Sequence, residues 1–368
     1  MTMNSDVRSR LIRFCQVLVC QQEARVIVPP QEPKSGFWFG GGNMAEAADG
    51  TLYVIGRYRN AGDSRTGTAA GVRGLELAVF RSSDRGRTFE KIVSWDKAAL
   101  NSSVGEVVSI EGSCLRFTPR GVEVFVSTEK SGIPYPDRVA SFLKPGAGVW
   151  SIDVMRADSV AELSSAPVEP AFSSTCPQHL HVKDPFFWAT RSGDRLGYCS
   201  HPFCWSSSNT GVADLPAIGQ TVTAPEHSVF ARGTTWDVAM TRGTCVLPIP
   251  RIGPFADRQH SVLFYCGGEC LRPLDEHSAA VSRPRGYSCE ELGGAAWFVD
   301  DDIANAERLS DIQPMFLSPF GTACSRYVDV LHSKDGYYAT WQQSQPDFSQ
   351  PLVMNFVPEQ DAAAILFH

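Results

Sequence analysis

The sequence predicts an all-β fold, and two features of its 368 residues carry that prediction. Apolar runs of strand length recur along the chain, and each is bounded by Gly, Pro, Asp or Ser. Glycine (31 residues) and proline (24 residues) are both frequent, which suits many short strands joined by turns. A sandwich, a barrel and a propeller are all compatible with this pattern.

The N-terminal segment, residues 1–30, is where the clearest helix is expected, over residues 5–21. A short acidic segment at 159–163 is the other helical candidate. The apolar run 14–19 is interrupted by Gln16 and has neither the core nor the cleavage site of a signal peptide. No stretch reaches the ~20 apolar residues of a membrane helix. We therefore expect a cytoplasmic protein without a membrane partner.

Strands are expected where β-branched and aromatic residues gather between turn signals. The clearest runs are 51–58, 75–81, 122–128, 148–155, 261–266 and 295–299.

A repeated sequence pattern groups these strands into similar units. Five segments combine small or Gly-rich residues, one polar residue and an apolar strand, and each is followed by another strand. Their polar residues are Asn43, Glu111, Asp184, Asp237 and Arg326, spaced 53 to 89 residues apart. Each interval can hold a four-stranded sheet with its loops, so we predict a β-propeller of five blades over residues 31–360 as one domain. A sixth blade from residues 255–300 is the alternative.

The segment from Ser82 to Phe89, SSDRGRTF, follows the pattern Ser-x-Asp-x-Gly-x-Thr-Phe. It resembles the Asp-box of sialidase-like propellers, which are six-bladed. In that motif Asp84 accepts backbone N–H groups, Gly86 takes a left-handed conformation and Phe89 packs under a hairpin turn. The resemblance implies a structural role on an outer hairpin, away from the active site.

A second resemblance lies in the segment from His181 to Phe186, HVKDPF. Lys183-Asp184-Pro185 is similar to a motif of the five-bladed propeller glycosidases, the arabinanase, invertase and fructosidase group. There the Asp lies on an innermost strand, binds sugar hydroxyls and tunes the catalytic acid. The resemblance implies that the chain is a glycosidase.

Three carboxylates are expected to converge where the innermost strands surround the propeller axis. Glu111, Asp184 and Asp237 would then share acid, base or nucleophile and hydroxyl-binding roles, because like charges facing one cavity separate their pKa values. Glu129, Glu269 and Glu290 are further candidates for the general acid. The alternative is that some of these groups satisfy backbone groups between blades.

Other polar and aromatic residues are candidates for substrate binding. Arginines bind carboxylates or phosphates through paired hydrogen bonds, and tryptophans stack on sugar rings. The candidates are Asn43, Arg57, Arg65, Glu129, His201, Trp236, Arg242, Arg326 and Trp341. Arg57, Arg65, Arg242 and Arg326 are possible analogues of the sialidase arginine triad, although the usual arginine motif near a sialidase N-terminus is not evident.

The net charge and the cysteine spacing argue against two kinds of ligand, nucleic acids and metal ions. The net charge of −7 and the lack of a basic stripe argue against a nucleic-acid partner. The 11 cysteines do not show the paired spacing of a zinc site, so we expect neither a metal ion nor a cofactor.

The function predicted from these patterns is a glycoside hydrolase acting on the terminal sugar of an oligo- or polysaccharide. A glycoside phosphorylase and a propeller polysaccharide lyase are alternative enzymes. A non-catalytic carbohydrate-binding or scaffold propeller is the alternative of another class.

Overall fold

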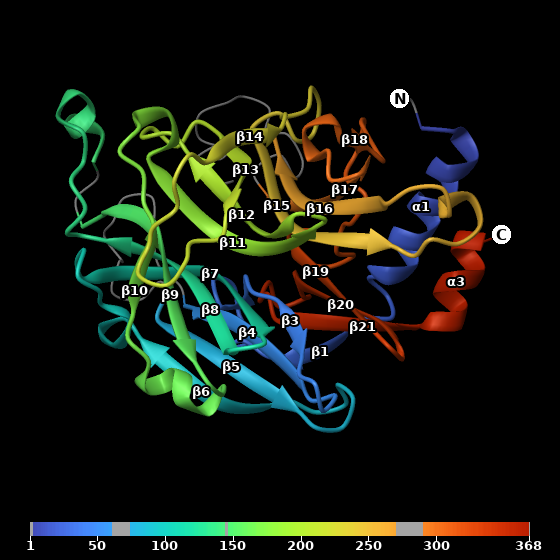
Figure 1. Cartoon of the computed structure of the whole chain (residues 1–368), viewed down its shortest axis with the longest axis horizontal. Coiled ribbons are helices and arrows are strands. Elements are labelled where there is room, and N and C mark those ends of the chain that lie inside the picture. The colour runs from blue at the N-terminus through green and yellow to red at the C-terminus, as the bar shows by residue number, and fades with distance from the viewer. Residues whose placement is uncertain (1–2, 61–73, 144–145, 270–289, 368) are drawn as a thin grey trace.

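The computed structural model describes residues 3–60, 74–143, 146–269 and 290–367, and strands dominate it (Figure 1). The strands form antiparallel meanders, with successive strands paired in chain order. None of the helices in the described part of the chain has the length and apolar character needed to cross a membrane.

The first two meanders lie in the N-terminal half. The first contains β2 (Trp38–Gly40), β3 (Met44–Glu46), β4 (Leu52–Arg59), β5 (Glu76–Ser82) and β6 (Glu90–Asp96). The second contains β7 (Val107–Thr118), β8 (Gly121–Lys130), β9 (Val149–Ala157) and β10 (Glu169–Phe172).

The next two meanders are hydrogen-bonded into one sheet. One contains β11 (His181–Thr190), β12 (Gly193–His201), β13 (Ser208–Asp214) and β14 (Glu226–Phe230). The other contains β15 (Met240–Ile249), β16 (His260–Gly268), β17 (Leu292–Val299) and β18 (Glu307–Arg308). A short parallel pairing of β13 with β15 joins them. Residues 255–300, considered above for a sixth blade, contribute β16 and β17 to this sheet.

The last meander joins the two ends of the chain. It contains β19 (Ser325–Ser333), β20 (Gly336–Gln343) and β21 (Leu352–Pro358), and β1 (Arg25–Val28) completes it by pairing with β21. Residues 25–28 therefore belong to the sheet structure, whereas the sequence placed them in a separate N-terminal segment.

Two α-helices cover the outside of this last meander (Figure 1). Helix α1 (Ser5–Leu18) begins after Asn4, whose side chain accepts a hydrogen bond from the Asp6 backbone N–H, and it contacts α3 (Glu359–Phe367). The helix predicted at 159–163 is a 3-10 helix displaced by two residues. The 3-10 helices are η2 (Ala98–Leu100), η3 (Asp137–Phe142), η4 (Ala161–Ser165), η5 (Pro177–His179), η6 (Gly253–Phe255) and η7 (Ile303–Asn305).

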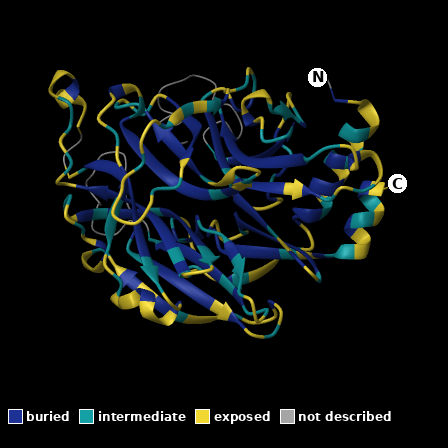
Figure 2. Ribbon diagram, in the orientation of Figure 1, coloured by how far each residue is buried: buried dark blue, intermediate teal, exposed yellow. Residues whose placement is uncertain are grey.

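The core lies between the sheets, because most inner and middle strands are buried on both faces (Figure 2). Such strands read as nearly continuous apolar runs rather than alternating ones. The helices α1 and α3 extend this core outward, with Phe14 packed edge-on against Tyr337 at a centroid distance of 5.4 Å.

The turn from Ser82 to Phe89 lies on an outer hairpin, between β5 and β6. The Asp84 carboxylate accepts hydrogen bonds from the Thr88 backbone N–H (2.9 Å) and from the Thr88 hydroxyl (2.6 Å). Gly86 is left-handed, with φ of 78°. These contacts give the turn the local geometry expected from its sequence, and none of its residues lines the cavity described next.

Candidate active site

Irregularities in four inner strands give the site its shape. The register of β7 shifts between Ile110 and Ser113, that of β11 between Lys183 and Phe186, that of β15 between Gly243 and Cys245, and that of β19 between Arg326 and Asp329. A bulge interrupts the in-and-out alternation of a strand and re-aims the side chains beside it. The polar residues at or beside these bulges are Glu111, Asp184, Arg242 and Tyr327.

Two of these residues have unusual backbone conformations. Asp184 and Tyr327 are left-handed, with φ of 53° and 54°. This conformation is uncommon for residues other than glycine, and such outliers cluster at functional sites. Both side chains are buried, at 5% exposure each. Gly112 permits the approach of Asp184, because its backbone N–H donates to Asp184 Oδ1 at 3.1 Å and there is no room for a Cβ.

The Tyr327 hydroxyl joins two of the predicted carboxylates. It lies 3.4 Å from Glu111 Oε1 and 3.3 Å from Asp184 Oδ1, and it can donate to either one. Arg57 Nε donates to the same Glu111 oxygen at 3.0 Å. Arg242 Nη1 donates to Asp184 Oδ2 at 3.2 Å, and Lys183 Nζ lies 3.7 Å from that oxygen. Residues from β4, β7, β11, β15 and β19 therefore meet at one place.

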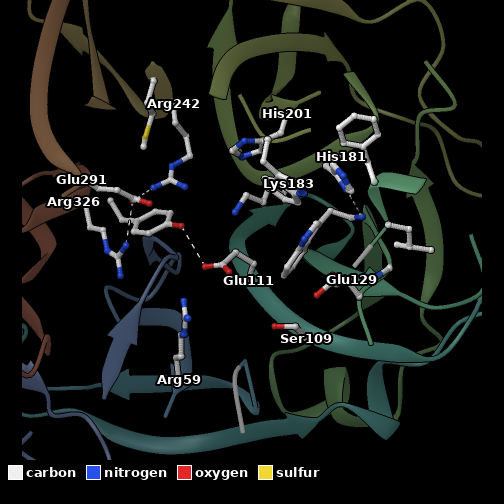
Figure 3. A pocket seen from close by; sticks show the side chains of 18 of the residues that line it. Arg59, Ser109, Glu111, Glu129, His181, Lys183, His201, Arg242, Glu291 and Arg326 are labelled. Carbon is white, nitrogen blue, oxygen red and sulfur yellow. Dashed lines mark hydrogen bonds and ion pairs between the residues drawn. The ribbon is translucent and has the colours of Figure 1, made fainter. Parts of the chain in front are cut away.

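Glu291, just before β17, extends this network. It pairs with Arg242, and Arg326 Nη1 lies 3.3 Å from its Oε2 (Figure 3). Burial by itself would raise the pKa of Glu291, but Arg242, Arg326 and Lys183 outweigh it and lower the pKa to about 2. In the same way Arg57, Lys183 and Arg59 overcome the effect of burial on Glu111 and hold its pKa well below the usual range. Both groups are therefore carboxylates at neutral pH.

A cavity of about 250 Å³ opens above this network. Its charged lining residues are Arg59, Lys183, Arg242 and Arg326 with Glu111, Glu129 and Glu291, and its aromatic lining includes Trp38, Tyr135, Phe142, Trp150 and Trp205. In the view of Figure 3, Glu111 lies between Glu291 on one side and Glu129 on the other.

The indole rings in the cavity wall contact the cations directly. Lys183 Nζ lies 5.2 Å from the ring centroid of Trp150 and 5.7 Å from that of Trp205. Trp38 lies against two guanidinium groups, those of Arg59 (4.2 Å) and Arg326 (4.1 Å). These contacts hold the cationic groups in place by cation–π attraction and leave polar groups beside aromatic faces, an environment that suits a sugar ring.

Two histidines in the cavity wall are neutral at physiological pH. Burial and the neighbouring Lys183 lower the pKa of His181 to about 3. Burial, Lys183 and Arg242 hold the pKa of His201 well below its usual range. His181 stacks on Trp205 at a centroid distance of 4.3 Å, and His201 contacts the same ring at a tilt, at 4.5 Å. They can offer hydrogen bonds to a ligand, but they do not add positive charge.

Six of the residues selected from the sequence come together here. Glu111, Glu129, His201, Arg242 and Arg326 line the cavity, and Asp184 lies directly beneath it in contact with Arg242 and Tyr327. Arg57 is buried behind Glu111, where it acts through that carboxylate.

The expected convergence of Asp237 with Glu111 and Asp184 is wrong. Asp237 precedes β15 by three residues and lies outside the cavity lining. Its fully buried carboxylate accepts hydrogen bonds from Arg308 Nε (2.7 Å) and from the Tyr265 hydroxyl (3.1 Å). This pairing ties the segment before β15 to β16 and β18, so Asp237 stabilises that meander.

Other selected residues also lie away from the cavity. Asn43 bonds the backbone of Leu115 through both its amide atoms and so links the first two meanders. Trp236 stacks on Tyr265 in the core, and Trp341 is completely buried with its Nε1 donating to Gln21. The burial of the two tryptophans and the backbone contacts of Asn43 contradict the substrate contacts expected of these residues.

The remaining candidates from the sequence are Glu269, Glu290 and Arg65. Glu269 follows β16 and is not part of the cavity lining. Glu290 lies one residue before Glu291 but is also outside the lining, and burial raises its pKa. Arg65 falls outside the described residues.

Sequence reasoning missed several residues that the site contains. Glu291 is adjacent to the selected Glu290, and the strand that follows determines which of the two faces the cavity. Lys183 and Tyr327 sit next to selected residues, so the strand-opening pattern held a signal for both. Trp150 and Trp205 come from a strand and a loop whose positions relative to the axis only the folded chain reveals. In the described part of the chain, no group of His, Cys, Asp and Glu residues is suited to a metal ion.

Comparisons with known proteins find the fold but no relative by sequence. Neither a family model nor a curated protein matches the chain. Among solved structures, a glycoside hydrolase aligns with a TM-score of 0.63 at 10% identity, over 96% of each chain. A thermostable family-43 glycoside hydrolase aligns with a TM-score of 0.56 at 12% identity, over 90% of this chain and 92% of the other.

A β-xylosidase also aligns, with a TM-score of 0.55 at 10% identity, over 91% of this chain and 95% of the other. The aligned proteins are propellers, and the alignments cover nearly the whole chain. The protein is therefore a β-propeller, and its cavity lies where inner strands of several meanders converge.

Proposed function

We propose that this protein is a five-bladed β-propeller glycoside hydrolase that acts on the terminal sugar of a carbohydrate. The observation that carries the proposal is the meeting of Glu111 and Asp184 at one tyrosine hydroxyl, 3.4 and 3.3 Å away, beneath an aromatic-walled cavity. Glycoside hydrolysis needs carboxyl groups on both sides of a scissile bond. The five antiparallel meanders support the blade number, and the glycoside hydrolases of similar fold support the reaction class.

The chemistry assigns a different role to each carboxyl group. Glu111, kept ionised by Arg57, acts as the base and takes a proton from water. The water oxygen then bonds to the anomeric carbon as the glycosidic C–O bond breaks. Glu129 donates a proton to the departing oxygen. It also lines the cavity, and in Figure 3 Glu111 lies between it and Glu291. Asp184, held by Arg242 and Lys183, orients the sugar from below.

Site variants test this proposal against a panel of nitrophenyl and unsubstituted glycosides. Glu111→Gln and Asp184→Asn should each lower kcat/KM by about 100-fold, the usual size of an acid–base contribution. Asp194→Asn is the matched control, because that carboxylate pairs with Arg116 outside the cavity. Wild-type activity in both site variants, or sugar binding by the wild-type protein without turnover of any glycoside, would contradict the proposal.

The role of Glu129 has a separate signature. A nitrophenolate leaves without a proton, whereas a sugar alkoxide needs one. Glu129→Gln should therefore lose activity on a disaccharide while retaining most activity on the nitrophenyl glycoside of the same sugar. Equal losses on both substrates would remove Glu129 from the role of proton donor.

A further inference from the structure

Four cationic side chains line the cavity. Its lining includes four cationic side chains and three carboxylates, and two of these carboxylates are occupied by arginines. Glu111 pairs with Arg57, which lies behind the cavity wall, and Glu291 pairs with Arg242 and Arg326 together. Two of the four cations, Arg59 of β4 and Arg326 of β19, lie against Trp38.

Arg326 is the least satisfied of these cations. Its residue is only 6% exposed, and of its three guanidinium nitrogens Nη1 meets Glu291 at 3.3 Å. Nε and Nη2 are buried and have no acceptor among the described residues. These two nitrogens form one edge of the guanidinium, and their parallel N–H groups match the two oxygens of a carboxylate or phosphate. A buried charged donor without an acceptor is unfavourable, so this edge calls for an anionic partner.

Arg59 provides a second cation at the same place. Its Cζ lies 4.2 Å from the Trp38 ring centroid, and the Cζ of Arg326 lies 4.1 Å from the same centroid. A single indole therefore supports both guanidinium groups beside the cavity that both residues line. Stacking fixes the plane of each guanidinium and so lowers the ordering cost of binding an oxyanion.

We propose that the subsite formed by Trp38, Arg59 and Arg326 binds an oxyanion carried by the sugar, the carboxylate of a hexuronic acid or the phosphate of a sugar phosphate. This inference rests on the proposed function, because it names the substrate class of the same site. The sugar ring lies between the indole rings. Because Nε and Nη2 of Arg326 are buried, a shift of this side chain opens their edge to the anionic group of the sugar. The substrate is then an acidic glycan rather than a neutral pentose or hexose polymer.

Calorimetric titration of the whole protein with matched ligands tests this assignment. The pairs are glucuronate with glucose and galacturonate with galactose, with glucose 6-phosphate and inorganic phosphate as the phosphate arm. At least one acidic sugar should bind at least 10-fold more tightly than its neutral counterpart at low salt. The tighter of the uronate and the sugar phosphate identifies the source of the oxyanion. Equal affinity of acidic and neutral sugars overturns the proposal, and so does binding of inorganic phosphate alone.

Arginine variants test which side chains produce the preference for the acidic sugar. Arg326→Lys keeps the charge but loses the paired N–H edge, so it should lose most of the preference for the acidic sugar over the neutral one. Arg59→Met should weaken the preference in the same direction. Arg116→Met is the control, because Arg116 pairs with Glu123 and Asp194 outside the cavity. An unchanged preference in a folded Arg326→Lys protein and in Arg59→Met overturns the assignment.

This inference and the proposed function can fail independently. Hydrolysis of neutral glycosides without any preference for acidic ones would leave the hydrolase intact and remove the anionic subsite. Tight binding of an acidic sugar without cleavage of any glycoside would keep the subsite and remove the hydrolase.

Discussion

Glu111 owes its charge state mainly to Arg57. Arg57 is fully buried and donates to Oε1 of this carboxylate. The same oxygen can accept a hydrogen bond from the Tyr327 hydroxyl. Burial favours the protonated form of Glu111, whereas Arg57, Lys183 and Arg59 favour the ionised form and prevail. A base held in this way is ionised at neutral pH.

Replacing Arg57 should therefore change the pH dependence of catalysis. In Arg57→Gln the pKa of Glu111 should rise, because burial still favours the protonated carboxyl group while the largest opposing cation is gone. The base is active only when ionised, so the acidic limb of the kcat/KM profile should move to higher pH, with the largest loss below about pH 6 and the smallest at alkaline pH. The measurement is kcat/KM between pH 4 and 9, with Arg116→Gln as the control. A uniform loss at every pH would show that Arg57 does not act through the ionisation of Glu111.

Single residues also show how far the sequence predicts the site. The strand-opening pattern predicts that Glu111, Asp184 and Arg326 lie near the axis, and the bulges of their strands do direct them to one place. Asp237 was chosen on the same pattern, but the strand begins at Met240, so its carboxylate falls in the connection and meets Arg308. An offset of three residues thus separates a cavity residue from a structural one, and local composition does not encode that offset.

At the scale of elements, the bulges of β7 and β11 are packed against each other. Asp184 is left-handed, and its Oδ1 accepts a hydrogen bond from the Gly112 backbone N–H. A Cβ on Gly112 would lie 2.4 Å from Asp184 Oδ1 and 2.8 Å from Asp184 Cα. The second contact is with the backbone, so a side-chain rotation does not relieve it.

Gly112→Ala should therefore displace Asp184 and cost both stability and activity. We expect a loss of about 1–3 kcal/mol in the free energy of unfolding, as for other overpacked cores, with a fall in kcat/KM of at least about 10-fold. Gly243→Ala, beside the bulge of β15, is the matched comparison. There a Cβ meets side-chain atoms of Phe186 and Thr210 at 3.0 Å, and these can shift. The check is urea unfolding with kinetics of both variants; equal effects would mean that the contact with Asp184 is not the cause.

The order of strands along the chain was more predictable than the cavity wall. Apolar runs and turn residues mark most of the strands, because burial on both faces leaves a local trace in the sequence. Trp150 reaches the cavity from β9, the third strand of its meander, and Trp205 and Glu291 reach it from connections between strands. Their positions depend on how the meanders pack around the axis, which involves contacts between residues far apart in the chain.

At the scale of the whole molecule, the fold closes by joining its two ends. Strand β1 pairs with β21, so the N-terminal residues complete the sheet that the C-terminal strands begin. An uncovered β21 would expose an unpaired edge. Helix α1 reinforces this closure, since Leu11, Phe14, Cys15 and Leu18 are buried in the same apolar cluster as Tyr337 and Leu366.

The closure predicts that a residue far from the cavity controls global stability. Phe14 is completely buried and meets Tyr337 of β20, so Phe14→Ala should lower the free energy of unfolding by about 3–5 kcal/mol. Gln16→Ala, at an exposed position of the same helix, should change it by less than about 0.5 kcal/mol. Kinetics at 20 °C should stay near wild type in both variants, because neither residue contacts the cavity. Phe14→Ala could instead release only the helix, with early loss of amide protection in α1 and an unchanged main unfolding transition. That result would show that α1 does not contribute to the stability of the rest of the fold. A single cooperative transition at lower temperature would instead show that the joined ends hold the propeller together as one unit.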